Sequence, residues 1–249
     1  MIIHSGISKD QLLEGVFLLL DKPWGWSSYD VVKKVKHLLH RYTRLKNIKV
    51  GHAGTLDPLA EGLMILAVGK ATKLLQTKTD ADKSYRARLQ LGETTPSYDL
   101  ETKPEQSGDA TSIAESTIEE ILNQFRGPIY QQPPLFSAKR VQGKRAYELA
   151  RKGSDHQLEP VLVHIHELNL VSFETPELYL DIRCSKGTYI RSLANDLGAA
   201  LGCGAYLSKL TRTASGEFNL NDALSLQQLE ELLQESFPKP ASVEANEKQ

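Results

Sequence analysis

A short segment from Gly51 to Pro58 brings together residue types that could do chemistry: a histidine, an aspartate and two glycines. Glycine lets a backbone approach a ligand closely or adopt a positive φ angle. Pro58 restricts Asp57 to an extended conformation, which fixes the direction of its carboxylate. The segment therefore predicts a strand and loop that present Asp57, although an ordinary turn in which Asp57 is a local hydrogen-bonding residue would explain the same pattern.

Several common chemistries lack their motifs in this chain. A phosphate-binding Walker loop would need glycine where Met64 stands, no GxGxxG follows the first apolar run, and no GxSxG nucleophile elbow occurs. His164 and His166 could share one strand face as metal ligands, but without a partner cluster they are more typical of structural or surface residues. Lys186 lies in a polar turn, where a solvated lysine is more common than a Schiff base.

Basic and aromatic residues elsewhere in the chain could serve the Asp57 carboxylate: Lys83, Tyr85, Lys186, Tyr189 and Arg191. This set favours a single-carboxylate nucleophile or base, held ionised by an arginine that lowers its pKa. The tyrosines would offer aromatic faces on which a flipped base could stack.

The elements that would position these residues follow from the apolar pattern. Strands are predicted at residues 15–21, 63–68, 85–91, 161–174 and 178–184, and within 206–218. Helices are predicted at 27–39 with Ser27 and Ser28 as N-caps, from 69 onward, and at 117–125, 146–151, 188–201 and 225–235, the last with Gln228 in a capping box. No regular βαβ alternation occurs, so the predicted class is α+β with a largely antiparallel sheet. Residues from Pro238 onward are expected to be disordered.

The composition is that of an ordinary globular protein, with 40% hydrophobic and 24% charged residues in a chain of 249. No apolar run is long enough to span a membrane, and the first residues lack a signal-peptide pattern. Cys184 and Cys203 have no CxxC spacing, so we expect neither a disulfide framework nor a zinc ribbon. A reducing cytoplasm is the expected location.

Charge is segregated along the chain, although the formal net charge is only -1. Residues 31–50 contain seven basic side chains and no acidic one, whereas residues 101–120 and 217–249 are acidic. A basic body with acidic appendages suits a polyanion-binding face. A solvated helix face would explain each run equally well, so the pattern by itself only modestly favours nucleic acid.

The Asp57 segment and several blocks around it closely resemble the TruB family of tRNA pseudouridine synthases. The catalytic motif is matched by residues 51–60 (GHAGTLDPLA), followed by Gly62, Gly69 and residues 71–73. Other blocks follow in the family's order: residues 20–23 with Gly25 and 27–28, then 83–85, 91–99, 132–140, 143–147 with 150–151, 184–193 and 210–213. The resemblance extends over about residues 15–218. It implies the pseudouridine synthase fold, α+β with a central, mostly antiparallel mixed sheet flanked by helices.

The resemblance also implies an activity. A member of this family would isomerise the T-loop uridine, at tRNA position 55, to pseudouridine, exchanging an N-glycosidic bond for a carbon–carbon bond. The target base must leave the folded loop, because its reacting atoms are buried by stacking. The expected partner is the T arm of tRNA, with no cofactor, metal, membrane or obligatory protein partner, and the enzyme is expected to be a cytoplasmic monomer.

By similarity to the family, three residues would be catalytic. Asp57 would be the central carboxylate, and whether it attacks the sugar, attacks the ring or acts as a base stays open. Arg191 would pair with Asp57 and keep it charged. Tyr85 would stack on the flipped uracil, near the proton lost from its ring carbon. Without the resemblance, a core tyrosine and a buried ion pair would explain Tyr85 and Arg191 as well.

Five further residues are candidates for substrate binding. Tyr189 and Leu210 would line the pocket, and His52 would fill the space that the extruded base leaves. Lys22 and Asp99 would support the fold or contact phosphates, as would the basic stretch 33–49.

The predicted organisation is an N-terminal extension (1–14), a catalytic domain (15–218) and a short acidic helix and tail (219–249). Many bacterial relatives continue into an RNA-binding domain of the PUA type, for which this last segment is too short, so we expect a short form that binds tRNA through its catalytic domain. Two other hypotheses are a guide-RNA-dependent synthase within a ribonucleoprotein and a tRNA-folding helper whose benefit requires no catalysis.

Overall fold

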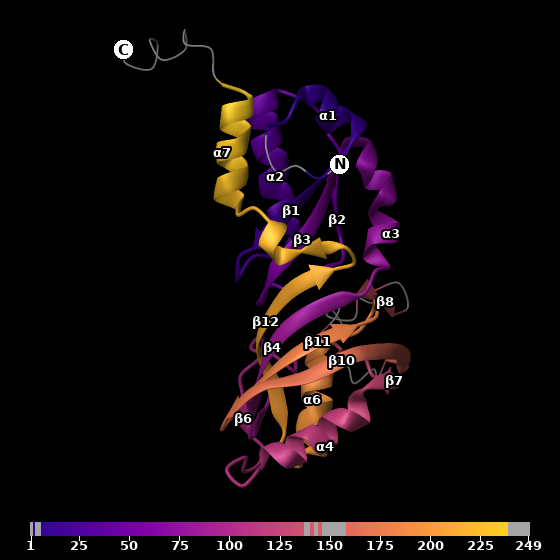
Figure 1. Cartoon of the computed structure of the whole chain (residues 1–249), viewed down its shortest axis with the longest axis vertical. Coiled ribbons are helices and arrows are strands. Elements are labelled where there is room, and N and C mark those ends of the chain that lie inside the picture. The colour runs from indigo at the N-terminus through magenta and orange to yellow at the C-terminus, as the bar shows by residue number, and fades with distance from the viewer. Residues whose placement is uncertain (1, 3–5, 137–139, 142–143, 146–157, 239–249) are drawn as a thin grey trace, which may run out of the picture. The chain divides into compact units, whose positions relative to one another are not determined.

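The computed structural model describes residues 2, 6–136, 140–141, 144–145 and 158–238. The chain forms two compact units, the first from residues 1–81 and 212–249 and the second from residues 82–211 (Figure 1). Strand β12 (Ala205–Ser215) passes from the second unit into the first. The predicted catalytic domain, 15–218, contains parts of both units. The predicted helix at 146–151 and the predicted tail beyond 238 lie outside the described residues.

The sheet of the first unit is covered on both faces. β1 (Val16–Lys22) pairs antiparallel with β3 (Ala60–Val68), which also pairs with β2 (Val50–Ala53) and lies next to β12 in the strand order. β13 (Phe218–Asn219) pairs with β12. Alternate residues of β1 enter two different apolar clusters, Leu18 and Leu20 one and Phe17 and Leu19 the other. Burial on both faces explains why these strands are continuous apolar runs without polar alternation.

Helices complete the first unit. Against the cluster of Leu18 and Leu20 lie α2 (Ser28–Thr43) and α7 (Leu226–Ser236), side by side in Figure 1. The capping box predicted for α7, Ser225 with Gln228, is confirmed. The remaining helical segments are α1 (Lys9–Glu14), η1 (Gly69–Leu74), α3 (Leu75–Thr79) and η2 (Leu220–Asp222).

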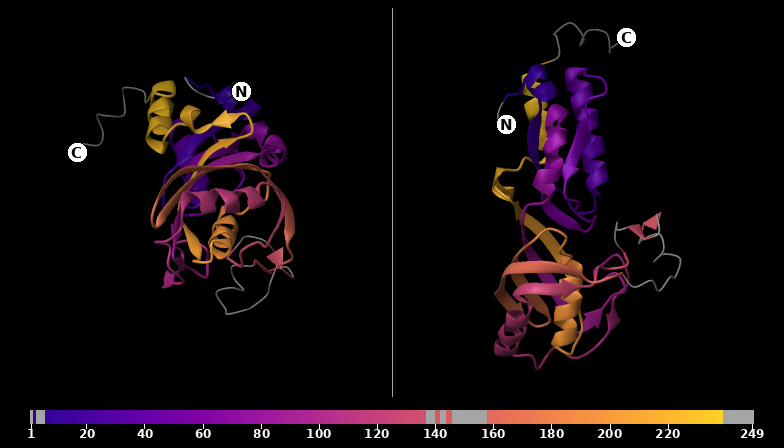
Figure 2. Two further views of the ribbon diagram at one scale, coloured as in Figure 1. Left: turned by 60° about the horizontal axis from the view of Figure 1, so that its bottom comes forward. Right: turned by 90° about the vertical axis from the view of Figure 1, so that its right-hand side faces the viewer.

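The second unit is an antiparallel sheet with helices on one face. The strand order is β12, β4 (Lys83–Leu91), β11 (Glu177–Cys184), β10 (Val161–Glu174) and β7 (Gly127–Gln131). Tyr85 of β4 lies opposite Ile182 of β11 in the strand register. Helices α4 (Glu115–Phe125) and α6 (Ile190–Ala200) contact each other and the sheet (Figure 2). The predicted α+β class with a mostly antiparallel sheet is confirmed.

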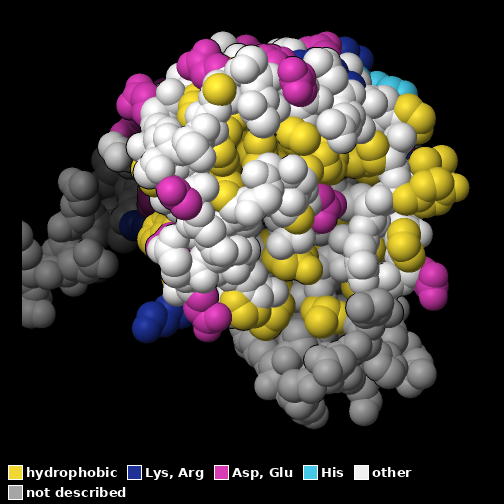
Figure 3. Space-filling view, turned by 90° about the horizontal axis from the view of Figure 1, so that it is seen from below, with side chains coloured by type: hydrophobic (Ala, Val, Ile, Leu, Met, Phe, Trp, Pro, Cys, Tyr) yellow, Lys and Arg dark blue, Asp and Glu magenta, His cyan; other side chains and the backbone are white. Residues whose placement is uncertain are grey.

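Two small hairpins extend from the second unit. β5 (Glu93–Thr94) pairs with β6 (Glu105–Gln106), and β8 (Arg140–Val141) pairs with β9 (Lys144–Arg145). β6 and the start of α4 lie within the acidic stretch 101–120, at one end of this unit. Figure 3 shows few lysine or arginine side chains on the face at that end. Among the described residues, no helix is long and apolar enough to cross a membrane.

Candidate active site

The backbone just before Asp57 is held by a buried serine. Asp57 follows β2 in the loop that leads to β3. Ser28 Oγ, in the first turn of α2, accepts the Leu56 N–H and donates to the Leu56 carbonyl, at 2.9 Å in both cases. We predicted Ser27 and Ser28 as N-caps, and only Ser27 caps the helix, through a capping box with Asp30. Ser28 instead fixes the residue that precedes the candidate catalytic carboxylate.

The backbone just after Asp57 is held from the turn between β1 and α2. The Gly25 N–H donates to the Pro58 carbonyl at 2.9 Å, and Gly25 has a φ of +83°, which favours glycine. Lys22 Nζ, at the end of β1, lies 3.4 Å from the same Pro58 carbonyl. The Ala60 N–H closes the loop on the Asp57 carbonyl at 3.1 Å. These bonds restrain the Asp57 backbone from both sides.

Lys22 is a fully buried cation beside the candidate carboxylate. Its amine also donates to the carbonyls of Pro23 and Trp26. Burial lowers the pKa of Lys22 to about 8, while the negative charges of Asp57 and Glu61 oppose that shift. Because the amine points at backbone carbonyls inside the unit, its contacts favour the fold-supporting role over a phosphate contact.

His52 precedes the Asp57 loop on β2, and Arg212 bonds the backbone at the start of that loop. His52 sits on β2 opposite Leu66, and its Nδ1 is buried without a hydrogen-bond partner among the described residues. Burial lowers the pKa of His52, and the positive charge of Arg212 acts in the same direction, so the imidazole is neutral near pH 7. Arg212 is buried and donates from Nε to the Leu63 carbonyl at 2.7 Å and from Nη2 to the Gly54 carbonyl at 3.2 Å.

Arg212 was not among the predicted site residues. It stands in the block 210–213, which we read only as a late strand. A full positive charge in a strand of a well-covered sheet needs acceptors nearby, and that requirement is the signal that could have identified it. Its guanidinium ties the loop before Asp57 to β3.

In the second unit, Arg191 is held by a tight polar turn. Arg191 lies in the first turn of α6 and is buried. Its Nη1 is 3.5 Å from Asp99 Oδ2 and 3.4 Å from the Ser97 carbonyl, and its Nη2 donates to the Phe136 carbonyl at 3.0 Å. Asp99 is buried as well and accepts the Glu101 N–H at 2.9 Å. Asp99 thus orients the Arg191 guanidinium, an ion pair that the sequence did not predict.

The predicted pocket tyrosines occupy defined positions in the second unit. Tyr85 is half-buried on β4, and Tyr189 is half-buried at the N-cap of α6. The buried Gln131 side chain accepts the Tyr189 N–H at 2.8 Å and donates to the Tyr189 carbonyl at 3.0 Å. Leu210 is buried on β12. Gln131 is a second supporting residue that sequence reasoning missed, because its partner is 58 positions away.

The predicted residues are therefore distributed over both units. His52, Asp57 and Lys22 belong to the first unit, as do Gly25, Ser28 and Arg212, which bond the backbone of the Asp57 loop. The other candidates belong to the second unit: Tyr85, Asp99, Tyr189, Arg191 and Leu210. The pairing of Asp57 with Arg191 remains a prediction.

The alternative metal site finds no support in the geometry. The rings of His164 and His166 stack with centroids 4.6 Å apart, and His166 Nε2 lies 3.1 Å from Asp82 Oδ2. Within the part of the chain that the structure describes, no group of three or more His, Cys, Asp or Glu residues could hold a metal ion. Lys186 is exposed, as expected for a solvated turn lysine.

Two solved structures resemble this chain in fold. The chain matches "Crystal Structure of a Cbf5-Nop10-Gar1 Complex" with 30% identity and a TM-score of 0.69, over 90% of this chain and 55% of that chain. It matches "Structure of H/ACA RNP bound to a substrate RNA containing 2'-deoxyuridine" with 27% identity and a TM-score of 0.66, over 91% and 57%. The protein thus spans little more than half the length of these two chains.

Relatives of similar length define the family. Residues 41–190 match the TruB family pseudouridylate synthase (N terminal domain), and residues 191–240 match the tRNA pseudouridylate synthase B C-terminal domain. The tRNA pseudouridine synthase B of Parabacteroides distasonis is 46% identical over 227 residues, which is 91% of this chain and 97% of that protein. The protein of the same name from Phocaeicola vulgatus is 48% identical over 220 residues, 88% and 94% of the two chains. The chain belongs to the TruB family of pseudouridylate synthases, which confirms the resemblance seen in its motifs.

Proposed function

We propose that this protein is a tRNA pseudouridine synthase that isomerises the T-loop uridine, position 55, to pseudouridine. The observation that carries the proposal is the 46% identity to a tRNA pseudouridine synthase B along 97% of that enzyme. The rigid support of the Asp57 loop from Lys22, Ser28 and Arg212 agrees with it, because catalysis needs a carboxylate of fixed direction.

The reaction would proceed by rearrangement within one nucleotide. The bond between N1 and C1′ breaks, a bond between C5 and C1′ forms, and the proton on C5 leaves while N1 gains one. No electrons are lost and nothing is hydrolysed, so the rearrangement requires no redox cofactor or nucleotide. The uracil must first flip out of the loop, since its reacting atoms are otherwise stacked.

Asp57 is the proposed catalytic carboxylate, and Arg191 is its proposed partner. A guanidinium beside a carboxylate favours the charged form, which is the nucleophilic and basic one. Asp99 acts through Arg191 as a positioning residue, because its Oδ2 lies 3.5 Å from the guanidinium Nη1. Tyr85 stacks on the flipped uracil, close to the proton that leaves C5.

The remaining candidates shape the pocket. Tyr189, fixed by Gln131, and Leu210 form its walls. His52 fills the space left by the extruded base, and its neutral imidazole suits a position inside a stack of bases. Lys22 supports the catalytic loop.

The proposed setting is that of an enzyme acting alone on tRNA in the cytoplasm. The T arm of tRNA is the partner, and the proposed form is a monomer without an obligatory protein partner. The named relatives that match nearly the whole length of this chain are tRNA pseudouridine synthases, which favours this setting over a guide-RNA-dependent particle.

The test is incubation of the purified protein with an unmodified tRNA transcript, followed by mapping of every modified uridine. We expect one pseudouridine, in the T loop, without added protein or guide RNA and in the presence of a metal chelator. A transcript with cytidine at position 55 is the matched control and should remain unmodified. A product outside the T loop would overturn the proposed substrate, and a product that requires a guide RNA would favour the guide-dependent type.

A further inference from the structure

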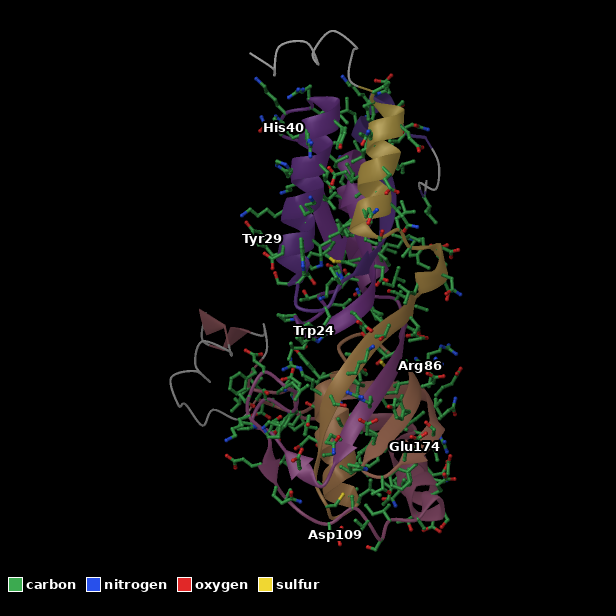
Figure 4. All side chains as sticks on the ribbon, turned by 90° about the vertical axis from the view of Figure 1, so that its left-hand side faces the viewer. Trp24, Tyr29, His40, Arg86, Asp109 and Glu174 are labelled. Carbon is green, nitrogen blue, oxygen red and sulfur yellow. The ribbon has the colours of Figure 1, made fainter. Side chains whose placement is uncertain are left out.

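Three aromatic side chains are exposed in the turn between β1 and α2 and in the first turn of α2, in the first unit. Trp24 is 60% exposed, Tyr29 72% and Trp26 36%. Figure 4 shows Trp24 and Tyr29 along one edge of this unit, with His40 farther along α2. Aromatic side chains bury a large apolar area when they can, so a group of them left in solvent marks an interaction surface.

Basic side chains continue this surface along α2. Lys33 and Lys36 follow Tyr29 by four and seven positions, so the three share one face of the helix. Lys34 and Arg41 pair with Glu230, whereas Lys33 and Lys36 form no ion pair with any described residue. We call Trp24, Trp26, Tyr29, Lys33 and Lys36 the aromatic–basic surface.

The aromatic–basic surface is hollowed where it includes Trp26 and Lys33. A shallow depression of about 490 Å³ lies against α2, lined by Gly25, Trp26, Asp30, Lys33, Lys34 and His37. Asp30 is its acidic member, and its carboxylate is engaged by the Ser27 N–H at 3.0 Å and by the Ser27 hydroxyl. The depression therefore offers the exposed cation of Lys33 beside the indole of Trp26.

The surface is joined directly to the loop of Asp57. The Gly25 N–H bonds the Pro58 carbonyl, and Lys22 Nζ bonds both the Trp26 and the Pro58 carbonyls. All of these residues belong to the first unit. A polymer with one residue bound at Asp57 would therefore extend over neighbouring surface that is aromatic and basic.

We propose that the aromatic–basic surface binds substrate RNA beyond the flipped base, an inference that rests on the proposed function. An unpaired base stacks on Trp24 or Tyr29, and Lys33 and Lys36 contact phosphates. Base–aromatic stacking and lysine–phosphate contacts are the interactions by which proteins hold RNA strands. A protein partner fits less well, because lysine is depleted from the cores of protein–protein interfaces.

The first test uses Trp24→Ala and Tyr29→Ala, with affinity for unmodified tRNA and single-turnover pseudouridine formation as readouts. We expect Kd and KM to rise about tenfold or more per lost stack, with little change in the rate at saturating tRNA. Tyr130→Ala is the matched control, because Tyr130 is 77% exposed on β7 of the second unit. An equal loss in Tyr130→Ala, or no loss in either test variant, would overturn the inference.

The second test measures the salt dependence of tRNA binding by Lys33→Ala/Lys36→Ala. We expect the slope of log Kd against log salt to fall by roughly 0.7–0.9 for each lysine that contacts a phosphate. Lys9→Ala is the control, since Lys9 is an exposed lysine in α1. An unchanged slope in the double variant would contradict the phosphate contacts.

Failure of this inference can be told apart from failure of the proposed function. If the unaltered protein forms pseudouridine and the Trp24 and Tyr29 variants keep its KM, only the surface assignment is wrong. If the unaltered protein binds tRNA but forms no pseudouridine, while the variants lose affinity, the proposed reaction is wrong and the surface assignment stands.

Discussion

Removing the Ser28 hydroxyl tests whether the backbone beside Asp57 must be held for catalysis. Ser28 is 3% exposed and Leu56 is also 3% exposed, so Ser28→Ala leaves a buried N–H and a buried carbonyl of Leu56 without this partner. Leaving a buried backbone group unpaired costs about 1–3 kcal/mol. We expect the free energy of unfolding to fall by about 2 kcal/mol.

The catalytic consequence of Ser28→Ala should be larger than its stability loss suggests. Leu56 directly precedes Asp57, and a displacement of about 1 Å at a catalytic group can lower a rate by about 100-fold. We expect single-turnover pseudouridine formation at saturating tRNA to slow by roughly 10- to 100-fold. The assays are urea denaturation for stability and rapid quench with pseudouridine mapping for the rate.

The neighbouring residue provides a matched control. Ser27→Ala removes the N-cap of α2 and should cost about 1 kcal/mol of stability, but the Ser27 side chain bonds Asp30, whereas that of Ser28 bonds Leu56. Its rate at saturating tRNA should stay near that of the unaltered protein. If both variants lose rate equally, or if Ser28→Ala retains full activity, the argument that Ser28 positions Asp57 is refuted.

Three other predictions concern the supports around the site. Burial holds the pKa of Lys22 at about 8, against 10.5 for an ordinary lysine, so the unfolded chain binds more protons between these values. Stability should therefore contain a component that rises with pH from about 8 to 10, by at most about 1.4 kcal/mol per pH unit, and Lys22→Met should lack it in denaturation curves. Arg212→Lys should lower the free energy of unfolding by about 1–3 kcal/mol, because one amine cannot reach both the Leu63 and the Gly54 carbonyls; unchanged thermal unfolding would contradict this. Gln131→Met should destabilise the protein by a similar 1–3 kcal/mol through the two backbone groups of Tyr189, and an equal loss in the exposed neighbour variant Tyr130→Ala would show that Gln131 has no special role.

Much of the fold could be predicted because buried strands and helices show recognisable patterns of apolar residues in the sequence. The apolar runs at β1 and β3 and the capping box at Ser225 gave the elements of the first unit with small errors at their ends. α2 runs four residues past the predicted end, because Thr43 buries its side chain and bonds the Leu39 carbonyl. Helix α1 was missed although its Ser8–Gln11 capping box is a local signal, since six residues are too few to show a helical period.

The site was predictable only in part. The motif around Asp57 and the blocks that resemble the family predicted the candidate residues, but not the hydrogen bonds that position them. Ser28 and Leu56 are 28 positions apart, and Arg191 and Phe136 are 55 apart. Contacts of this kind depend on how the strands are arranged in space, so no pattern within a single segment can reveal them. For the same reason, the sequence could name Asp99 as a candidate but could not predict its ion pair with Arg191.

The most direct test of the account is pseudouridine formation by Asp57→Asn, measured beside tRNA binding and thermal unfolding. Asparagine keeps the size of the side chain and removes its charge. We predict a folded protein that binds tRNA with unchanged affinity and forms no pseudouridine at position 55. Pseudouridine formation at the unaltered rate would contradict the assignment of Asp57 as the catalytic carboxylate.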